Sequence, residues 1–183
     1  DVHLDPHWLT ATTTVMQQDD RIGLVGGKLL YATRPELCNA YGGVTSRIGL
    51  GWDGHEGEPH AALDQPIDVL WINSSALLAR RSMLLQIGGF DETFFYGYEE
   101  SDLGWRANVC GWRAVVVPDA LAYHRVAESV GLSDSKIVFH YSKNRLRALL
   151  KNYGAGRLAR RLPGYLLYAT TDAFARAPRR SEE

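Results

Sequence analysis

Residues 88–124 read GGFDETFFYGYEESDLGWRANVCGWRAVVVPDALAYH, and this stretch decides the fold class. Three acidic residues fall at the start of a predicted helix over 99–109, where the helix dipole favours negative charge, and Gly111 follows as a stop. Residues 114–117 form a short apolar run that ends at Pro118, a pattern typical of a fully buried strand. A helix that leads directly into a buried strand indicates an α/β fold.

The sequence before this stretch predicts further alternation of helices and strands. Residues 32–66 are rich in Gly, Pro and polar residues, so we expect mostly irregular loops there. A glycine pair inside the first long strand would allow another backbone to approach closely. The expected elements are a helix over 6–18, a strand over 21–31, one short strand near 43–49, a continuous buried strand over 67–80 and a short helix over 81–86 that ends at Gly88.

The last part of the chain differs from the rest in charge. Residues 1–139 hold 10 Lys and Arg against 18 Asp and Glu, whereas residues 140–183 hold 10 against 3. A basic amphipathic helix is expected from an N-cap at Ser133, followed by a second helix from residue 156 or 157 that Pro163 should kink or interrupt. We therefore expect one α/β domain over residues 1–132 and a basic helical tail over residues 133–183.

Composition excludes several classes of protein. With 183 residues, 45% of them hydrophobic and 22% charged, the chain has the make-up of one globular domain with a tail. Cys38 and Cys110 lack the spacing of a zinc site or a disulfide framework, which favours a reducing, cytoplasmic compartment. There is no apolar run of about 20 residues and no signal-peptide pattern. The start on an aspartate, without an initiator methionine, indicates a fragment of a longer domain.

Four charged residues are candidates for chemistry. Glu99, Glu100 and Asp102 could hold an acceptor and remove its proton, although acids in a first helical turn are also favoured by the dipole alone. His124 follows the predicted buried strand and could bind a divalent cation together with an acid from elsewhere. The alternative for His124 is a hydrogen-bonded structural role. Asp1 carries no signal by itself because chain ends are commonly polar.

Aromatic and small polar residues surround these acids in the sequence. Flat aromatic faces stack on the C–H surfaces of pyranose rings while acids bind their hydroxyls, so a sugar-binding cleft is one interpretation and core packing is the other. Asn73, Ser74 and Ser75 lie midway along a predicted buried strand, where a ligand contact is plausible but unspecific. GxGxxG, P-loop, GxSxG and HExxH motifs are absent. The aromatic candidates are Trp71, Phe94, Phe95, Tyr96, Tyr98 and Trp105.

Several ordered blocks together resemble family 2 glycosyltransferases of the GT-A fold, particularly the bacterial rhamnosyltransferase-like branch. Residues 98–124 are similar to the family's Glu-Asp-x-Asp-Leu-x-x-Arg helix, Gly-Trp turn and terminal histidine. Residues 69–95 resemble the strand, helix and turn that precede the catalytic base, residues 22–31 an earlier strand, and residues 1–9 the end of the aspartate-rich metal motif with the helix that follows it. The resemblance implies a GT-A-like mixed sheet flanked by helices, with the N-terminal half of that domain missing from this sequence.

The resemblance also implies roles for individual residues. Glu100 takes the place of the catalytic aspartate that deprotonates the acceptor hydroxyl, with Asp102 as a second catalytic-site acid. Asp1 and His124 would hold a divalent cation, Mg or Mn, on the donor diphosphate. Two departures are Glu100 where the family has aspartate and Ser74 where it commonly has glycine. The implied substrate-binding residues are Glu99, Trp71, Asn73, Ser74, Trp105 and Arg106.

The implied reaction is the inverting transfer of a sugar, rhamnose being one candidate, from a nucleoside-diphosphate donor to a glycan or lipid-linked acceptor in cell-wall or polysaccharide biosynthesis. The basic helices would rest on an anionic membrane surface, as a peripheral protein on the inner face of the cell membrane, or pack on the parent domain. Nucleic-acid binding is disfavoured because the acidic body would repel phosphate. The alternative function is a catalytically inactive remnant that binds carbohydrate or a membrane surface.

Overall fold

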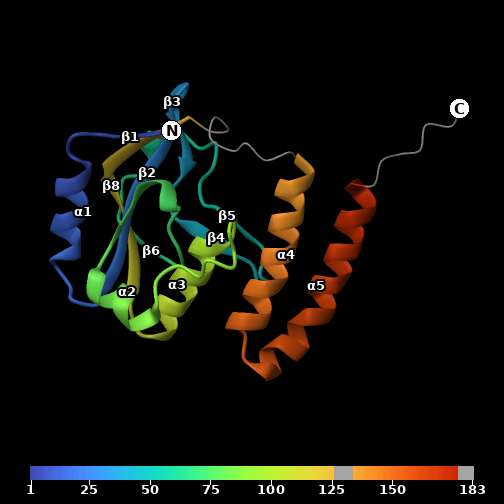
Figure 1. Ribbon diagram of the computed structural model, residues 1–183. Helices are drawn as coiled ribbons and strands as arrows, with labels where there is room; N and C mark the ends of the chain where they lie inside the picture. The colour runs from blue at the N-terminus through green and yellow to red at the C-terminus, as the bar shows by residue number, and fades with distance from the viewer. Residues whose placement is uncertain (126–133, 177–183) are drawn as a thin grey trace, which may run out of the picture.

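A mixed β-sheet with helices on both faces forms the body of the protein in the computed structural model (Figure 1). The structure describes residues 1–125 and 134–176. Within these residues the sheet has six strands, and its centre is a long parallel pair, β2 (Ile22–Tyr31) and β8 (Arg113–His124). The shorter strands pair antiparallel with this centre: β1 (Val2–Leu4) and β6 (Ile67–Val69) with β8, and β3 (Arg34–Ala40) and β7 (Leu77–Ala79) with β2.

Successive residues of β2 point to opposite faces of the sheet and so supply two separate cores. Val25 packs with Trp8 beneath α1 (Trp8–Met16), whereas Leu24 packs with Met83 beneath α2 (Arg81–Ile87) and α3 (Glu99–Val109). Figure 1 shows α1 on one side of the sheet and α2 and α3 on the other. The predicted α/β fold class is therefore confirmed.

Four further elements lie outside the six-stranded sheet. The short strands β4 (Gly43–Thr45) and β5 (Gly51–Asp53) form a separate antiparallel pair. The helices α4 (Asp134–Asn152) and α5 (Ala155–Arg176) follow, and α4 packs on α3 (Figure 1). Because α4 packs on the body, the basic segment contributes to the same structure as the sheet.

Most predicted elements are present, with shorter or longer bounds. The helix expected over 99–109 has those bounds, and the helix from residue 81 ends at Gly88 in the left-handed conformation. The strand expected over 114–117 is too short, because β8 continues through Pro118 to His124. Pro118 is tolerated inside β8 because the pairing of β2 with β8 shifts its register between Gly26 and Lys28. The two backbones are close at this shift, since a Cβ on Gly27 would lie 1.7 Å from the Ala120 carbonyl oxygen.

Three sequence-based expectations are wrong. The short strand expected near 43–49 is present as β4, but the region 32–66 also contains β3 and β5. The proline of β3 lies on an edge strand, and the β4–β5 pair is held by tertiary contacts. The expected strand over 67–80 is broken into β6, a 3₁₀ turn at Ser74–Ala76 and β7, since the Asn73 side chain accepts the Ser75 N–H and caps that turn.

Pro163 does not interrupt the second C-terminal helix, so of the two expected effects, a kink or an interruption, the interruption is wrong. The residues after it remain helical and dock on α4 through Tyr165, which is buried and whose hydroxyl donates to the Ser142 carbonyl. The predicted N-cap Ser133 and the expected domain boundary at residues 132 and 133 lie outside the described residues.

Candidate active site

A cavity of about 640 Å³ lies where the ends of the sheet strands meet the start of α3 and one side of α4. The walls come from segments far apart in the sequence, from residue 1 to residue 141. Its lining contains no Lys or Arg within the part of the chain that the structure describes, so the cavity is strongly acidic. The carboxylates that line it are Asp1, Asp53, Glu56, Glu99 and Glu100.

The turn before α3 determines how the two glutamates enter the cavity. Tyr98 adopts a left-handed backbone conformation with φ of 74° and directly precedes them. Its hydroxyl accepts hydrogen bonds from the Gly51 backbone N–H at 3.1 Å and from Arg145 Nε at 3.0 Å. Non-glycine residues rarely adopt this conformation unless surrounding contacts hold them there. The strand β5 and the helix α4 together therefore hold the turn that presents Glu99 and Glu100.

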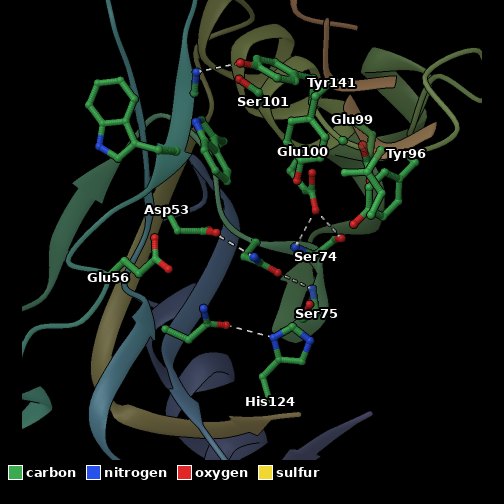
Figure 2. Close-up of a pocket in the computed structure, with 18 of the residues that line it drawn as sticks. Asp53, Glu56, Ser74, Ser75, Tyr96, Glu99, Glu100, Ser101, His124 and Tyr141 are labelled. Atoms are coloured by element: carbon green, nitrogen blue, oxygen red, sulfur yellow. Dashed lines mark hydrogen bonds between the residues drawn. The ribbon is translucent and has the colours of Figure 1, made fainter. Parts of the chain in front are cut away.

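Asn144 of α4 also holds the turn that precedes α3. Its buried side-chain Nδ2 donates to the carbonyl oxygens of Phe94, Tyr96 and Gly97 at 2.6, 2.8 and 2.9 Å. One turn earlier in α4, Tyr141 lines the cavity itself (Figure 2). Sequence reasoning assigned this helix to a basic tail and missed its part in the site.

The neighbouring glutamates lie in different surroundings. Glu100 Oε1 accepts hydrogen bonds from Ser74, from its hydroxyl at 2.7 Å and from its backbone N–H at 3.3 Å (Figure 2). Burial, and then the negative charge of Glu100, raise the pKa of Glu99 to about 7. Glu99 Oε2 has no hydrogen-bond partner among the described residues. Glu100 is thus held by hydrogen-bond donors, whereas the surroundings of Glu99 favour its protonated form more than water does.

Asp53 is a cavity carboxylate that sequence reasoning missed. It ends β5, within the region that the sequence predicted to be mostly loop. Its Oδ1 accepts a hydrogen bond from Asn73 Nδ2 at 3.2 Å, and Asn73 Oδ1 in turn accepts the Ser75 N–H at 3.0 Å. Burial raises the pKa of Asp53 to about 6, opposed by the Asn73 hydrogen bond and assisted by the charge of Glu100.

Asp1 and His124 meet at another part of the cavity. His124 Nε2 lies 3.4 Å from Asp1 Oδ2, and His124 Nδ1 lies 2.9 Å from Asn39 Oδ1. Nδ1 therefore carries the proton in the neutral ring, and burial lowers the pKa of His124. The described residues contain no group of three His, Cys, Asp or Glu side chains placed to hold a metal. Asp1 and His124 thus offer a two-residue site for a cation.

Three of the predicted site residues lie away from the cavity. Asp102 has no exposed surface, and its carboxylate accepts from Arg106 Nε at 2.8 Å, Lys151 Nζ at 3.0 Å and Asn152 Nδ2 at 3.0 Å. Arg106 also donates to backbone carbonyls at the end of α2, and Trp105 packs on the ring of Tyr153. The structure places these side chains where they join α3 to α2 and α4.

The other predicted residues are gathered at the cavity. They come from the ends of sheet strands, from the 3₁₀ turn and from the start of α3. Trp71 fits on the wall because Gly43 has no side chain; a Cβ on Gly43 would lie 2.0 Å from the Trp71 indole. The gathered set is Asp1, Trp71, Asn73, Ser74, Glu99, Glu100 and His124. The additional polar lining residues are Asn39, Asp53, Glu56 and Tyr141.

The raised pKa of Asp53 predicts a dependence of stability on pH. The pKa is about 6 in the folded state against 3.8 for the unperturbed group, so the folded state binds the proton more tightly. The contribution of Asp53 protonation to the free energy of unfolding is thus fully present below pH 4 and is lost as pH rises to about 6. We expect Asp53→Asn to raise the free energy of unfolding by about 1–3 kcal/mol at pH 7.5.

This expectation is checked by urea unfolding of wild type and Asp53→Asn at pH 4 and pH 7.5. The stabilisation should be present at pH 7.5 and much smaller at pH 4, where the wild-type carboxyl is protonated. Glu92→Gln is a suitable control, because Glu92 is an exposed acid outside the cavity lining. An equal effect at both pH values would contradict the prediction.

Comparison with known proteins finds relatives that are similar to this chain over part of their length. The N-acetylglucosaminyl-diphospho-decaprenol L-rhamnosyltransferase of Mycobacterium tuberculosis is 48% identical over 61 residues, which are 33% of this chain and 20% of that protein. The O-antigen biosynthesis protein RfbC of Myxococcus xanthus is 30% identical over 138 residues, covering 69% of this chain and 10% of RfbC. The pre-mycofactocin glycosyltransferase of M. tuberculosis is 32% identical over 107 residues, covering 58% and 21%. No family model matches the chain.

A solved structure supports the fold. The crystal structure of GalNAc-T7 with UDP, GalNAc and Mn²⁺ superposes with a TM-score of 0.59 at 14% identity, and the match covers 81% of this chain and 29% of that one. The protein thus has the GT-A glycosyltransferase fold, as the sequence predicted. Two of these sequence relatives are glycosyltransferases by name, one of them a rhamnosyltransferase, in agreement with the resemblance stated from the sequence. The chain spans about a fifth of two of these relatives and a tenth of the third.

Proposed function

We propose that this chain is the acceptor-side part of an inverting glycosyltransferase, with Glu100 as the general base. The observation that carries the proposal is the position of the Glu100 carboxylate, which lies on the cavity wall with one oxygen held by Ser74. A carboxylate in this position can take the proton of an acceptor hydroxyl as that oxygen attacks the anomeric carbon. The sequence relatives, which transfer sugars by their names, support the same reaction type.

The acidity of the cavity supports a divalent cation as part of the proposal. A nucleoside diphosphate is anionic, and the lining offers five carboxylates and, among the described residues, no Lys or Arg to neutralise it. Asp1 and His124 have the oxygen and nitrogen atoms that Mn²⁺ or Mg²⁺ accepts, and substrate phosphates commonly complete such a coordination shell. When bound, the cation would stabilise the departing diphosphate. Asn39 would orient His124 by accepting the Nδ1 proton.

The proposal also covers the acceptor and a contact with the membrane surface. A lipid-linked glycan acceptor is suggested by the decaprenol-linked substrate in the name of one relative. Among the basic residues of α4, Arg145 and Lys151 bind the body of the protein through Tyr98, Asp91 and Asp102. A proposed contact with anionic lipid therefore rests on the exposed residues of α5, which include Arg157, Arg160, Arg161, Leu166 and Leu167. None of the helices in the described ranges has the length and apolar character needed to cross a bilayer.

The proposal is tested by sugar transfer with the full-length protein. A panel of UDP-, GDP- and dTDP-linked hexoses is offered with a polyprenyl-diphosphate glycan acceptor, and products are identified by mass spectrometry. We expect transfer from at least one donor with inversion at the anomeric carbon. We also expect a chelator to lower the rate by at least about 100-fold, because the acidic cavity would repel an unneutralised diphosphate.

Restoration of the rate by Mn²⁺ or Mg²⁺, but not by K⁺ at equal ionic strength, is the control for a specific cation. Transfer that continues at the original rate in the chelator would contradict the metal part of the proposal. Complete absence of transfer and of donor hydrolysis across the panel would contradict the enzyme itself and favour a binding remnant.

A further inference from the structure

We propose that Asp53 is a specificity-determining residue of this site, accepting a hydrogen bond from a ring hydroxyl of the sugar held in the cavity. The inference rests on the proposed function and extends it to the recognition of the sugar. Asp53 and Glu56 lie on one side of the cavity, opposite Glu99, Glu100 and Tyr141 (Figure 2). A sugar within reach of the Glu100 base would thus have Asp53 on its other side.

The two oxygens of Asp53 have different surroundings. Asn73 Nδ2 donates to Oδ1 at 3.2 Å and fixes the orientation of the carboxylate. No hydrogen bond from a described residue is made to Oδ2, although the residue lines the cavity. A carboxylate accepts through both oxygens, so Oδ2 is available to a hydroxyl donor.

Aromatic surface lies beside this carboxylate. Trp52 and Trp71 line the same cavity, and Trp71 is held in place by the donation of its Nε1 to Thr45 Oγ1 at 3.1 Å. Carbohydrate sites combine a flat apolar face with a few fixed polar groups that set the orientation of the ligand. The Asp53 side of the cavity has both components, whereas a purely structural acid would need neither.

Ionised Asp53 also destabilises the folded protein. Burial raises its pKa to about 6, so the fold disfavours the ionised form that predominates at neutral pH. Buried carboxylates with raised pKa values are found preferentially at functional sites, where the group is retained for its chemistry. The main structural bond of Asp53, the one from Asn73, would be made equally well by a neutral asparagine at this position.

A short chain of contacts couples Asp53 to the proposed base. Asn73 donates to Asp53 and caps the 3₁₀ turn by accepting the Ser75 N–H. Ser74, in that same turn, donates to Glu100. The distance between the hydroxyl-binding carboxylate and the base is therefore set by one rigid turn. A sugar bound to Asp53 would be oriented relative to Glu100 by that geometry.

The test compares wild type and Asp53→Asn of the full-length protein on hydroxyl-deleted sugars. The probes are the best donor of the UDP-, GDP- and dTDP-hexose panel with its monodeoxy analogues, and then the polyprenyl-diphosphate glycan acceptor with its own analogues. We expect Asp53→Asn to lower kcat/KM about 10–100-fold for the complete substrate, because a charged acceptor binds a hydroxyl more strongly than an amide. For the one analogue that lacks the bound hydroxyl, wild type and Asp53→Asn should have equal kcat/KM.

The analogue series that abolishes the difference shows whether Asp53 reads the donor or the acceptor sugar. Asp53→Glu retains the charge but moves the carboxylate by about 1.5 Å. We expect it to lower kcat/KM for the complete substrate and to match wild type on the analogue that lacks the bound hydroxyl. Glu58→Gln, outside the cavity lining, should match wild type throughout. An unchanged kcat/KM, or an equal loss on every analogue, would overturn the inference. An inactive wild type would instead contradict the proposed function.

Discussion

Glu100→Gln is expected to lower kcat about 10³-fold in the full-length protein while leaving the fold intact. Removal of a general base costs about 10²–10⁴-fold in rate. The glutamine amide has nearly the shape of the carboxylate, and its Oε1 can still accept the hydrogen bonds that Ser74 donates at 2.7 and 3.3 Å. The loss should therefore appear in kcat, and the KM for the donor should change little. Initial rates at saturating donor and acceptor measure this.

Glu92→Gln is the matched control for this experiment. Glu92 is an exposed acid eight positions earlier, and it does not line the cavity. It should retain wild-type turnover, and both variants should unfold at the wild-type temperature. If Glu100→Gln kept more than about a tenth of wild-type turnover, the base would have to be a different group, and Glu99 would be the next candidate in the same cavity.

Glu100 and Ser74, the two departures from the pattern of the family that the sequence resembles, are in contact in the structure. The longer side chain of Glu100 moves the carboxylate by about one C–C bond, or about 1.5 Å. Ser74, which stands where the family commonly has glycine, supplies the hydroxyl that holds this carboxylate at 2.7 Å. The serine thus restrains the carboxylate of the proposed base, which would otherwise have more rotational freedom.

Local signals in the sequence were sufficient to predict the bounds of α2 and α3. The acids of the first turn of α3 and the glycine after its end define its bounds, and the same holds for α2 with Gly88. The strand pair β4–β5 depends instead on tertiary contacts, such as the Gly43 N–H bonded to the Trp71 carbonyl. Because β5 was missed, Asp53 could not be recognised as part of the cavity.

The helix α4 shows a different limit of sequence reasoning. Its basic residues predicted contact with a partner of negative charge, but at least two of them bond to side chains of the protein itself. Arg145 binds the Tyr98 hydroxyl, and Lys151 binds Asp91 at 2.7 Å and Asp102 at 3.0 Å. Residues about 50 positions apart in the sequence make these bonds, so charge patterning along α4 could not identify the partners.

Asp102 illustrates the same limit, because a conspicuous acid beside the proposed base proves to be buried. We expect Asp102→Ala to lower the free energy of unfolding by about 3–5 kcal/mol, the cost of removing one partner from a buried ion pair. The side chain has no exposed surface, and its loss would leave Arg106 and Lys151 without their shared carboxylate and Asn152 without its acceptor. Urea unfolding followed by tryptophan fluorescence measures the change.

A surface acid separates this effect from a general loss of charge. The side chain of Asp20 is fully exposed and lies 3.9 Å from Arg80, so Asp20→Ala should change stability by less than about 0.5 kcal/mol. Lys151→Met provides a second test, since it removes one cation from Asp102 and should also destabilise the contact between α3 and α4. A stable but inactive Asp102→Ala would contradict the structural role and return Asp102 to the acceptor site. Loss of stability would assign this acid to the framework that holds α3, and with it Glu100, in place.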